Sequence, residues 1–450
     1  MKRIRDWLIA NWSFLSNAAS LVGTTVVTSG FGFVYWIVAT HQFSQKAVGI
    51  GSAAISAMML IGYIGMLGLG TVLIGELSRR PDNAGALIST GLIVSAVAST
   101  LMAVCFAILS PYLSGDLDIL SENLTGILIF ALGAALTGIT LVLDHALVGL
   151  MRGGIQLWRN AAFSIGKLLI IWGAGLWYAD KSGLTIYTTW LLGNALSLVV
   201  LIPPLLVQRV NISMLLPQPR LVRDLGGVAI KHHLLNTALR APSLILPTLV
   251  IAFLSAKANS ALYSAWMMVS LILAVPVALT TILYAVGSAE ISELVEKIKL
   301  SLRLSFLLCA LSVIPFFLMA GIILEIFGRS YADQATWSLR ILLISIFPNI
   351  IKVHYVAIIR VSGKLEKGIV VITLIGLMEL LLAAVGAQSG DLNGLSIGWL
   401  IGESLGMVFT LRLVYAVARN KGEFQMPASS IAPGAVEGES GRMVAPSTSS

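Results

Sequence analysis

One arginine lies inside an apolar stretch long enough to cross a lipid bilayer. Arg240 is eight residues into the segment HHLLNTALRAPSLILPTLVIAFL, His232 to Leu254. At about 1.5 Å per residue it lies roughly 12 Å along a helix. An ionisable side chain there costs about 2.5–3.5 kcal/mol on membrane-insertion scales, so it requires a partner or a task. Either a carboxylate on another helix or the phosphate groups of a bound molecule would meet that requirement, because the planar guanidinium offers paired donors.

Three more basic residues share one apolar segment, residues 335–359. Arg340 lies about five residues from one end of its segment, so it is a candidate either for substrate contact or for snorkelling to the interface. Lys352 and His354 lie near the other end of that segment, past Pro348. Both are candidates for substrate contact, and the alternative is contact with lipid head groups.

Two carboxylates also fall inside apolar segments. Glu379 lies near the middle of one segment and Glu403 lies about a third of the way into the last one. A carboxylate kept away from water can carry a proton in a coupled transport cycle. The alternative is an ion pair with Arg240 or Arg340.

Asp144 and Lys167 lie at similar shallow depths in neighbouring segments. They are expected to form an ion pair that tethers two helices near the cytoplasm, with ion coupling as the alternative. Cys105 and Cys309 have no nearby metal-ligand partners and are predicted to be small buried side chains. The sequence predicts no metal, no cofactor and no catalytic residue.

Composition explains why these charges are unusual. The 450 residues are 57% hydrophobic and 11% charged, whereas a soluble domain is about 25% charged. The mean hydropathy is +0.92, and apolar windows recur along the chain. The pattern predicts an all-α polytopic membrane protein with twelve transmembrane helices. The predicted spans are 15–39, 48–75, 87–110, 124–148, 163–178, 187–207, 234–254, 261–286, 302–325, 335–359, 368–386 and 395–416.

The basic residues indicate the orientation of these spans. If the chain begins in the cytoplasm, twenty Lys and Arg residues fall on the inner side and four fall outside, namely Lys46, Lys181, Lys257 and Arg329. Inner loops carry such an excess, so both termini are predicted to be cytoplasmic. This topology also explains the net charge of +8, and no nucleic-acid partner is expected.

The two halves of the chain resemble each other. A shift of 211 aligns Ser44, Lys46 and Ala47 with Ser255, Lys257 and Ala258. Six helices are an even number, so the halves are predicted to be parallel repeats. The predicted parts are a cytoplasmic N-terminus (1–14), an N-lobe (15–207), a cytoplasmic inter-lobe loop (208–233), a C-lobe (234–416) and a disordered cytoplasmic tail (417–450).

Aromatic residues gather toward the outer ends of the predicted spans. They are expected to form an interfacial belt. The residues are Tyr35, Trp36, Trp172, Trp177, Tyr178, Trp190, Tyr263 and Trp266.

The absence of several sequence motifs argues against some kinds of activity. No G-x-x-x-x-G-K-[ST] stretch indicates ATP binding, and no H-E-x-x-H or paired-Cys motif indicates a metal. A membrane-bound glycan transferase or polymerase would present carboxylates on a sizeable loop. The longest outer loop, 111–123, is expected to be a solvated acidic connection, and the alternative is sugar binding through Asp116, Asp118 and Glu122.

Three stretches resemble polysaccharide and lipid-linked oligosaccharide flippases of the multidrug/oligosaccharidyl-lipid/polysaccharide (MOP) exporter superfamily. They are residues 17–79, the stretch ALVGLMRGGIQLWRNAAFSIGKL (Ala146 to Leu168), and residues 241–279. The resemblance covers roughly residues 10–415. It implies a V-shaped pair of lobes that open alternately to the two sides of the membrane. The implied substrate is a polyprenyl-pyrophosphate-linked oligosaccharide or polysaccharide precursor, moved from the inner to the outer leaflet.

In two features this sequence departs from particular branches of the superfamily. The drug-exporting branch typically has an acidic residue in its first helix, and residues 15–39 contain none. The peptidoglycan-precursor branch typically has arginines in helices one and two, whereas Arg79 and Arg80 lie in the following loop. Both departures favour the general polysaccharide branch.

The resemblance therefore implies a non-enzymatic flippase in a bacterial plasma membrane. Its partners would be a lipid-linked glycan, membrane lipids and other polysaccharide-assembly proteins. The alternatives are a small-molecule or multidrug exporter of the same superfamily and, third, a polytopic glycan transferase or polymerase.

Overall fold

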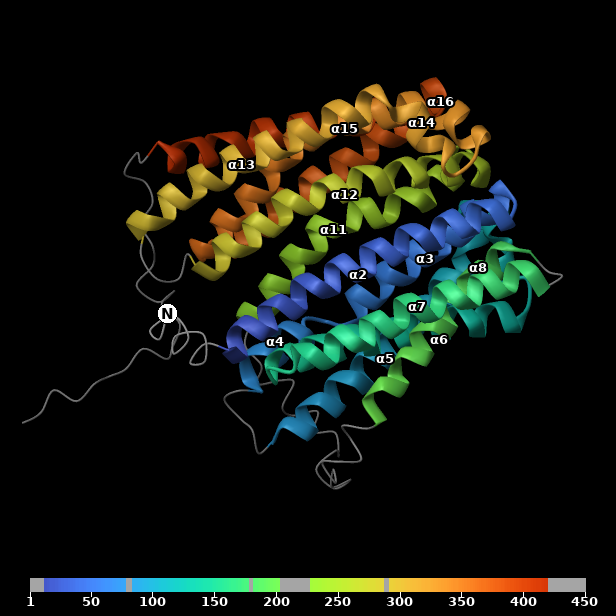
Figure 1. Cartoon of the computed structure of the whole chain (residues 1–450), viewed down its shortest axis with the longest axis horizontal. Helices are drawn as coiled ribbons and strands as arrows, with labels where there is room; N and C mark the ends of the chain where they lie inside the picture. Colours follow the sequence, from blue (N-terminus) through green and yellow to red (C-terminus); the bar gives the residue numbers. More distant parts are fainter. Residues whose placement is uncertain (1–11, 78–82, 178–180, 203–226, 287–290, 420–450) are drawn as a thin grey trace, which may run out of the picture.

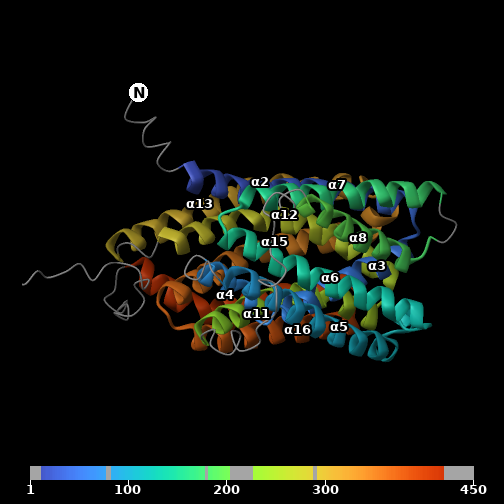
Figure 2. The same ribbon diagram turned by 90° about the horizontal axis from the view of Figure 1, so that it is seen from below.

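A computed structural model describes residues 12–77, 83–177, 181–202, 227–286 and 291–419 of the chain. Long helices run side by side along one direction (Figures 1 and 2). The first half contains α2 (Trp12–Gln42), α3 (Gln45–Gly65), α4 (Leu69–Glu76), α5 (Ala84–Leu113), η2 (Gly115–Leu120), α6 (Leu124–Gly149), α7 (Gly153–Trp177), α8 (Gly183–Ser197) and η3 (Leu198–Leu201). The second half contains α11 (Gly227–Phe253), α12 (Ala256–Val286), α13 (Ile291–Leu318), α14 (Ala320–Glu325), α15 (Arg329–Val361) and α16 (Leu365–Ala418).

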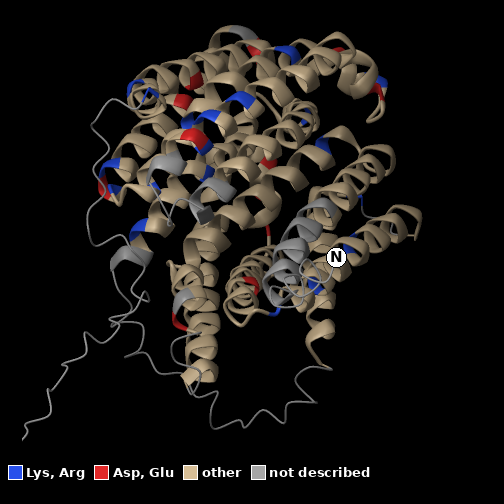
Figure 3. Ribbon diagram, turned by 60° about the vertical axis from the view of Figure 1, so that its left-hand side comes forward, with Lys and Arg blue, Asp and Glu red and all other residues tan. Residues whose placement is uncertain are grey.

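The predicted all-α membrane architecture is confirmed. Eleven helical stretches of the described residues are long and apolar enough to cross a membrane, and α2, with 31 residues, occupies the first predicted span. Lys, Arg, Asp and Glu are sparse along the helices (Figure 3). The predicted inter-lobe loop falls mostly, and the predicted tail almost entirely, outside the described residues.

Three of the predicted spans depart most clearly from the observed helices. The fifth span begins at Gly153 and the ninth at Ile291, about ten residues before the predicted starts at 163 and 302, because polar first turns hide a helix from a hydropathy window. The second span is interrupted between α3 and α4, where Leu67 and Gly68 have φ values of 49° and 81°. This left-handed backbone, which suits Gly68, ends one helix and begins another.

α16 is a helical hairpin rather than one straight rod. Its chain turns at Asp391, whose φ is 60°, and the two arms then pack against each other. Glycines on the second arm allow this close approach: a Cβ added at Gly398 would lie 2.0 Å from the carbonyl oxygen of Leu382. The arms form the eleventh and twelfth spans, Leu365–Ser389 and Asp391–Ala418.

The two halves of the chain form two lobes. α2 packs along α7 and α5 along α6 in the first lobe, whereas α15 packs along α16 in the second. The lobes meet where α3 contacts α11 and α12, which lie beside α2 and α3 in Figure 1. Residues of both lobes therefore line the central interface.

The proposed repeat is visible in the caps of two helices. The Ser44 hydroxyl accepts a hydrogen bond from the Ala47 amide (3.2 Å), and the Ser255 hydroxyl accepts one from the Ala258 amide (3.0 Å). These are the positions that the 211-residue shift aligns. Matching residues therefore perform the same local task in both halves.

Polar contacts join the lobes near the first turns of α3 and α12. Asn259 of α12 donates to the Gly49 carbonyl (2.7 Å) and to the Ser52 hydroxyl (3.0 Å) of α3. Backbone approaches backbone here, because a Cβ added at Gly49 would lie 1.7 Å from the carbonyl oxygen of Ala256. We call these the cross-lobe contacts of Gly49 and Asn259.

The acidic loop takes part in the same junction. An Asp116 oxygen lies 2.8 Å from Lys46 Nζ, and Asp116 also accepts a hydrogen bond from the Ala256 amide (3.1 Å). The hydrogen bond from Lys46 holds the pKa of the Asp116 carboxyl below its usual value. The prediction of a merely solvated connection was wrong for Asp116, since it caps a helix of the other lobe.

Several side chains are placed differently from their predictions. Tyr35 and Trp36 are buried because α2 packs against α7 and α8, so they do not form an interfacial belt. Trp172 and Trp177 are exposed, as a belt requires, and Tyr178 lies outside the described residues. Cys309 is buried, whereas Cys105 is exposed on the outer face of α5.

Candidate functional site

A cavity of about 340 Å³ lies within the second lobe, between α11, α12, α15 and α16. It brings together four of the eight predicted site residues: Arg240, Lys352, Glu379 and Glu403. Of the other four, Arg340 and His354 contact other groups, and Asp144 and Lys167 lie in the first lobe. The remaining cavity lining includes Trp266, Trp399, Asn349, Ser243, Ser270 and Ser345.

Lys352 connects two carboxylates from the two arms of α16. Its Nζ lies 2.7 Å from Glu379 Oε1 and 2.8 Å from Glu403 Oε1, and all three side chains are buried. The hairpin positions the carboxylates, because Gly402 packs directly on the backbone of Glu379. Neither Glu379 nor Glu403 pairs with Arg240 or Arg340, so that alternative was wrong. Lys352 also lies too deep in the lobe for the predicted head-group contact.

The charges of Lys352, Glu379 and Glu403 do not sum to zero. Two carboxylates share one ammonium, and Glu403 Oε1 also accepts from Asn349 Nδ2 (3.0 Å). The second oxygen, Glu403 Oε2, is buried and has no hydrogen-bond partner among the described residues. A buried acceptor left unpaired costs about 1–3 kcal/mol, so this oxygen favours a ligand, a water molecule or a proton.

A second unpaired polar atom belongs to the same helix face. Trp399, one turn before Glu403 on α16, has a buried Nε1 that no group in the described part of the chain contacts by a hydrogen bond. Its ring meets Trp266 of α12 edge to face at 5.1 Å. The cavity therefore combines aromatic walls with an unused donor and an unused acceptor.

Arg240 is exposed at the edge of the cavity. Its guanidinium carbon lies 5.4 Å from the ring centre of Tyr63, which belongs to the other lobe. Among the described residues, no carboxylate lies within ion-pair distance of it. Its donors remain available to an anion that enters between the lobes.

Arg340 and His354 are held by neighbouring helices. Arg340 Nε donates to the carbonyl of Phe317 (3.1 Å), and its guanidinium lies 4.7 Å from the ring centre of Trp337. His354 is fully buried. Its Nδ1 donates to the Ile350 carbonyl (2.8 Å), so Nε2 accepts from the Ser301 hydroxyl (2.8 Å). Head-group contact for His354 is therefore excluded by its burial.

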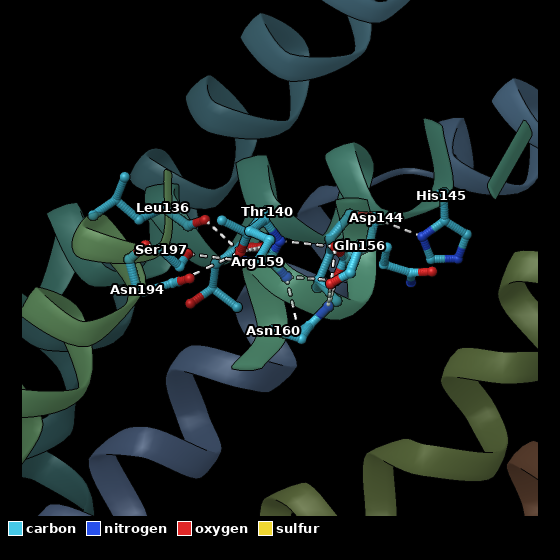
Figure 4. Close-up of polar contacts among 11 residues, drawn as sticks. Leu136, Thr140, Asp144, His145, Gln156, Arg159, Asn160, Asn194 and Ser197 are labelled. Atoms are coloured by element: carbon cyan, nitrogen blue, oxygen red, sulfur yellow. Dashed lines mark hydrogen bonds and ion pairs between the residues drawn. The ribbon is translucent and has the colours of Figure 1, made fainter. Parts of the chain in front are cut away.

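Asp144 pairs with Arg159 rather than with Lys167 (Figure 4). Arg159 Nε lies 2.9 Å from Asp144 Oδ1, and a terminal nitrogen of Arg159 lies 2.6 Å from Oδ2. The same guanidinium donates to the Ser197 hydroxyl (3.1 Å), and thus ties α6, α7 and α8 together. The predicted tether between helices is present, but its partner is Arg159, which the sequence had placed in an inner loop.

Lys167 instead lies among aromatic rings. Its Nζ is 3.4 Å from the ring centre of Trp190, 4.5 Å from that of Phe163 and 5.3 Å from that of Tyr35. The ion pair with Asp144 is excluded because the bidentate contact with Arg159 already occupies that carboxylate. Such close rings stabilise a cation through their electron-rich faces.

Sequence reasoning missed three residues of these clusters. Arg159 was hidden because the polar first turn of α7 lowered the local hydropathy. Asn349 and Trp399 carry no charge, so a search for charged residues in apolar segments did not select them. Their signal was positional: Trp399 precedes Glu403 by four residues, the spacing that places two side chains on one helix face.

Neither protein-family models nor curated protein sequences match this chain. Solved structures do match its fold. One is the inward-facing conformation of a multidrug resistance MATE family transporter of the MOP superfamily, with 14% identity, a TM-score of 0.70, and coverage of 90% of this chain and 99% of that chain. The outward-facing conformation of such a transporter matches with a TM-score of 0.56, 14% identity and coverage of 90% and 96%.

A third solved structure is a MOP superfamily transporter from Pyrococcus furiosus, described by the reverse polarity of its binding pocket, which suggests a different function. It has 15% identity, a TM-score of 0.60, and coverage of 90% of this chain and 96% of that chain. All three are transporters rather than enzymes. The chain therefore has the two-lobed helical fold of MOP-superfamily transporters.

Proposed function

We propose that this protein is a flippase in a bacterial plasma membrane, with both termini in the cytoplasm. It moves a polyprenyl-pyrophosphate-linked oligosaccharide or polysaccharide precursor from the inner to the outer leaflet by alternating access. Arg240 carries the proposal, because it is exposed at a lobe cavity and pairs with no carboxylate of the described residues. Its planar fork of donors matches phosphate oxygens.

The rest of the cavity suits the sugar of such a cargo. Trp266 and Trp399 supply aromatic surface, whereas Asn349 and Ser270 supply polar groups. A sugar hydroxyl both donates and accepts, so it can satisfy Glu403 Oε2 and Trp399 Nε1, which lack partners. Ligand sites commonly combine apolar walls with a few such polar groups.

The other predicted site residues receive supporting roles in this proposal. Lys352 balances one of the two carboxylate charges and holds both Glu379 and Glu403 at the cavity wall. Arg340 and His354 brace α15 against neighbouring helices. Membrane lipids and other polysaccharide-assembly proteins complete the expected partners.

Export of a small molecule is the second candidate function. It is favoured by solved structures of the same fold that are named multidrug resistance transporters, and Glu403 Oε2 offers an acceptor to a cationic drug. A glycan transferase is disfavoured, because Asp116 of the acidic loop already binds Lys46 and Ala256.

Reconstituted vesicles distinguish the two candidates. A fluorescent oligosaccharide on a polyprenyl diphosphate is placed in one leaflet, and its appearance in the other is followed with and without the protein; ethidium efflux is measured in parallel. We expect the protein to accelerate movement of the lipid-linked glycan and not of ethidium. Ethidium transport without glycan movement would reject the flippase and support the exporter.

A further inference from the structure

Lys167 is a buried cation without a counter-ion. Only 3% of it is exposed, and among the described residues no carboxylate pairs with it. Aromatic faces stabilise a cation modestly, whereas burying an ion away from water costs considerably more. The rings around Lys167 therefore compensate its charge only in part.

The groups that face Lys167 from the surrounding helices do not hold its proton in place. α2 contributes Tyr35, whose hydroxyl is 2.8 Å from Thr189 of α8. α8 contributes Trp190, and α7 itself contributes Phe163. The carboxylate of α6, Asp144, is bound by Arg159. No group in this set fixes the amine in one protonation state.

The aromatic surroundings of Lys167 extend across the lobe interface. Trp190 lies 6.4 Å from Trp36, centre to centre, and Trp36 lies 4.7 Å from Tyr263 of α12 in the other lobe. When the lobes rock against each other, the Trp36–Tyr263 contact must change. The same motion therefore alters the shielding of Lys167 from water.

We propose that Lys167 is the proton carrier of the first lobe and couples transport to a proton gradient. Its ammonium gives a proton to water on one side of the membrane, and the resulting amine takes a proton from water on the other side. The proposal rests on the transport function but not on the cargo, since it applies equally to a lipid-linked glycan and to a small molecule.

Trp190 reports the protonation of Lys167 directly. The emission of the purified full-length protein is recorded from about pH 5 to about pH 11, a range that contains the ordinary pKa values of histidine and lysine. We expect a transition that is lost in Lys167→Met and in Trp190→Phe. Lys257→Met, a change at an exposed lysine, is the matched control and should retain it. A missing transition in the unmodified protein, or one that persists in Lys167→Met, would overturn the proposal.

Transport assays test the coupling itself. In vesicles with a pH gradient and no membrane potential, we expect the gradient to accelerate transport at least several-fold in the unmodified protein and not at all in Lys167→Met. Lys167→Arg should behave like Lys167→Met, because a guanidinium keeps its proton. A full gradient response in either variant would reject Lys167 as the carrier. If ethidium but not the glycan is transported, the flippase proposal fails, whereas the role of Lys167 is decided by its gradient response.

Discussion

Lys167 and Glu379 occupy matching positions in the two lobes. They are 212 residues apart, and each packs against a glycine of the following span. A Cβ added at Gly193 would lie 2.6 Å from the Cβ of Lys167, and one added at Gly402 would lie 2.7 Å from the Cα of Glu379. The repeat therefore places a cation in one lobe where the other lobe has a carboxylate.

The residues after these glycines extend the correspondence. Asn194 donates to Thr140 at 3.4 Å in the first lobe, and Glu403 accepts from Lys352 at 2.8 Å in the second. Thr140 and Lys352 are also 212 residues apart. Two copies of one scaffold thus carry different charged groups at matching positions.

Substitution of Arg240 separates a cargo contact from a structural brace. Arg240→Ala should abolish glycan flipping while the protein accumulates normally, because no carboxylate is stranded by the change. Arg240→Lys keeps the charge without the two-pronged fork and should lower activity partially. Flipping rate and protein level in membranes are the measurements. A low level of Arg240→Ala, restored by a further Glu379→Gln or Glu403→Gln change, would show that the arginine is a brace.

Removal of the Lys352 ammonium should damage the fold itself. Lys352→Met leaves two buried carboxylates without a counter-ion, and breaking a buried pair in this way costs about 3–5 kcal/mol. The unfolding midpoint in detergent should fall sharply. Adding Glu379→Gln and Glu403→Gln together should recover most of the loss. A stable Lys352→Met protein would contradict the charge arrangement of the cavity.

Two ion pairs of the first lobe should differ in their importance. Arg159 is 3% exposed, so Arg159→Ala strands Asp144 and should cost about 3–5 kcal/mol. The side chain of Lys46 is 65% exposed, so Lys46→Ala should cost less than about 1 kcal/mol. Unfolding midpoints of both variants under one condition give the comparison. An equal fall in the unfolding midpoint of both variants would mean that burial does not determine how strongly each ion pair stabilises the protein.

The sequence was sufficient for the spans but not for the pairing of their charges. Hydropathy reports whether a segment suits lipid, so Arg240, Glu379 and Glu403 were recognised as intramembrane without a structure. Their partners depend on how each helix is rotated about its axis. For the same reason Tyr35 was expected in a belt, whereas packing of α2 against α8 buries it. Arg159 was missed because the first two turns of α7, GGIQLWRN, have low hydropathy and resemble a loop to a hydropathy window.

Reporter fusions test the orientation of the spans. The excess of basic residues on one side predicts cytoplasmic signals for fusions after Arg80, Arg223 and Lys367. These positions sample both halves of the chain and the connection between them. A periplasmic signal after Arg223 would invert the second half and contradict the parallel repeat.

Membrane potential should assist the proposed flipping. The two negative charges of the diphosphate move outward downhill when the potential is negative inside. The gain is about 4.6 kcal/mol per 100 mV, at about 2.3 kcal/mol per charge. Collapsing the potential in vesicles at constant pH should therefore slow the movement of the lipid-linked glycan. Lys167→Met should keep this response, because it removes only the response to the pH gradient. An unchanged rate after the collapse would exclude the effect.

The cross-lobe contacts of Gly49 and Asn259 form one closely packed junction between the lobes. The space between α3 and the first turn of α12 has no room for a methyl group at Gly49. In the proposed alternating-access cycle, any side chain there is expected to raise the free energy of the state in which these two helices touch, and Gly49 itself lies outside the cavity of the second lobe. Each 1.4 kcal/mol changes the ratio of closed to open molecules tenfold. A substitution at Gly49 is therefore expected to shift the balance between the two states of the proposed alternating-access cycle.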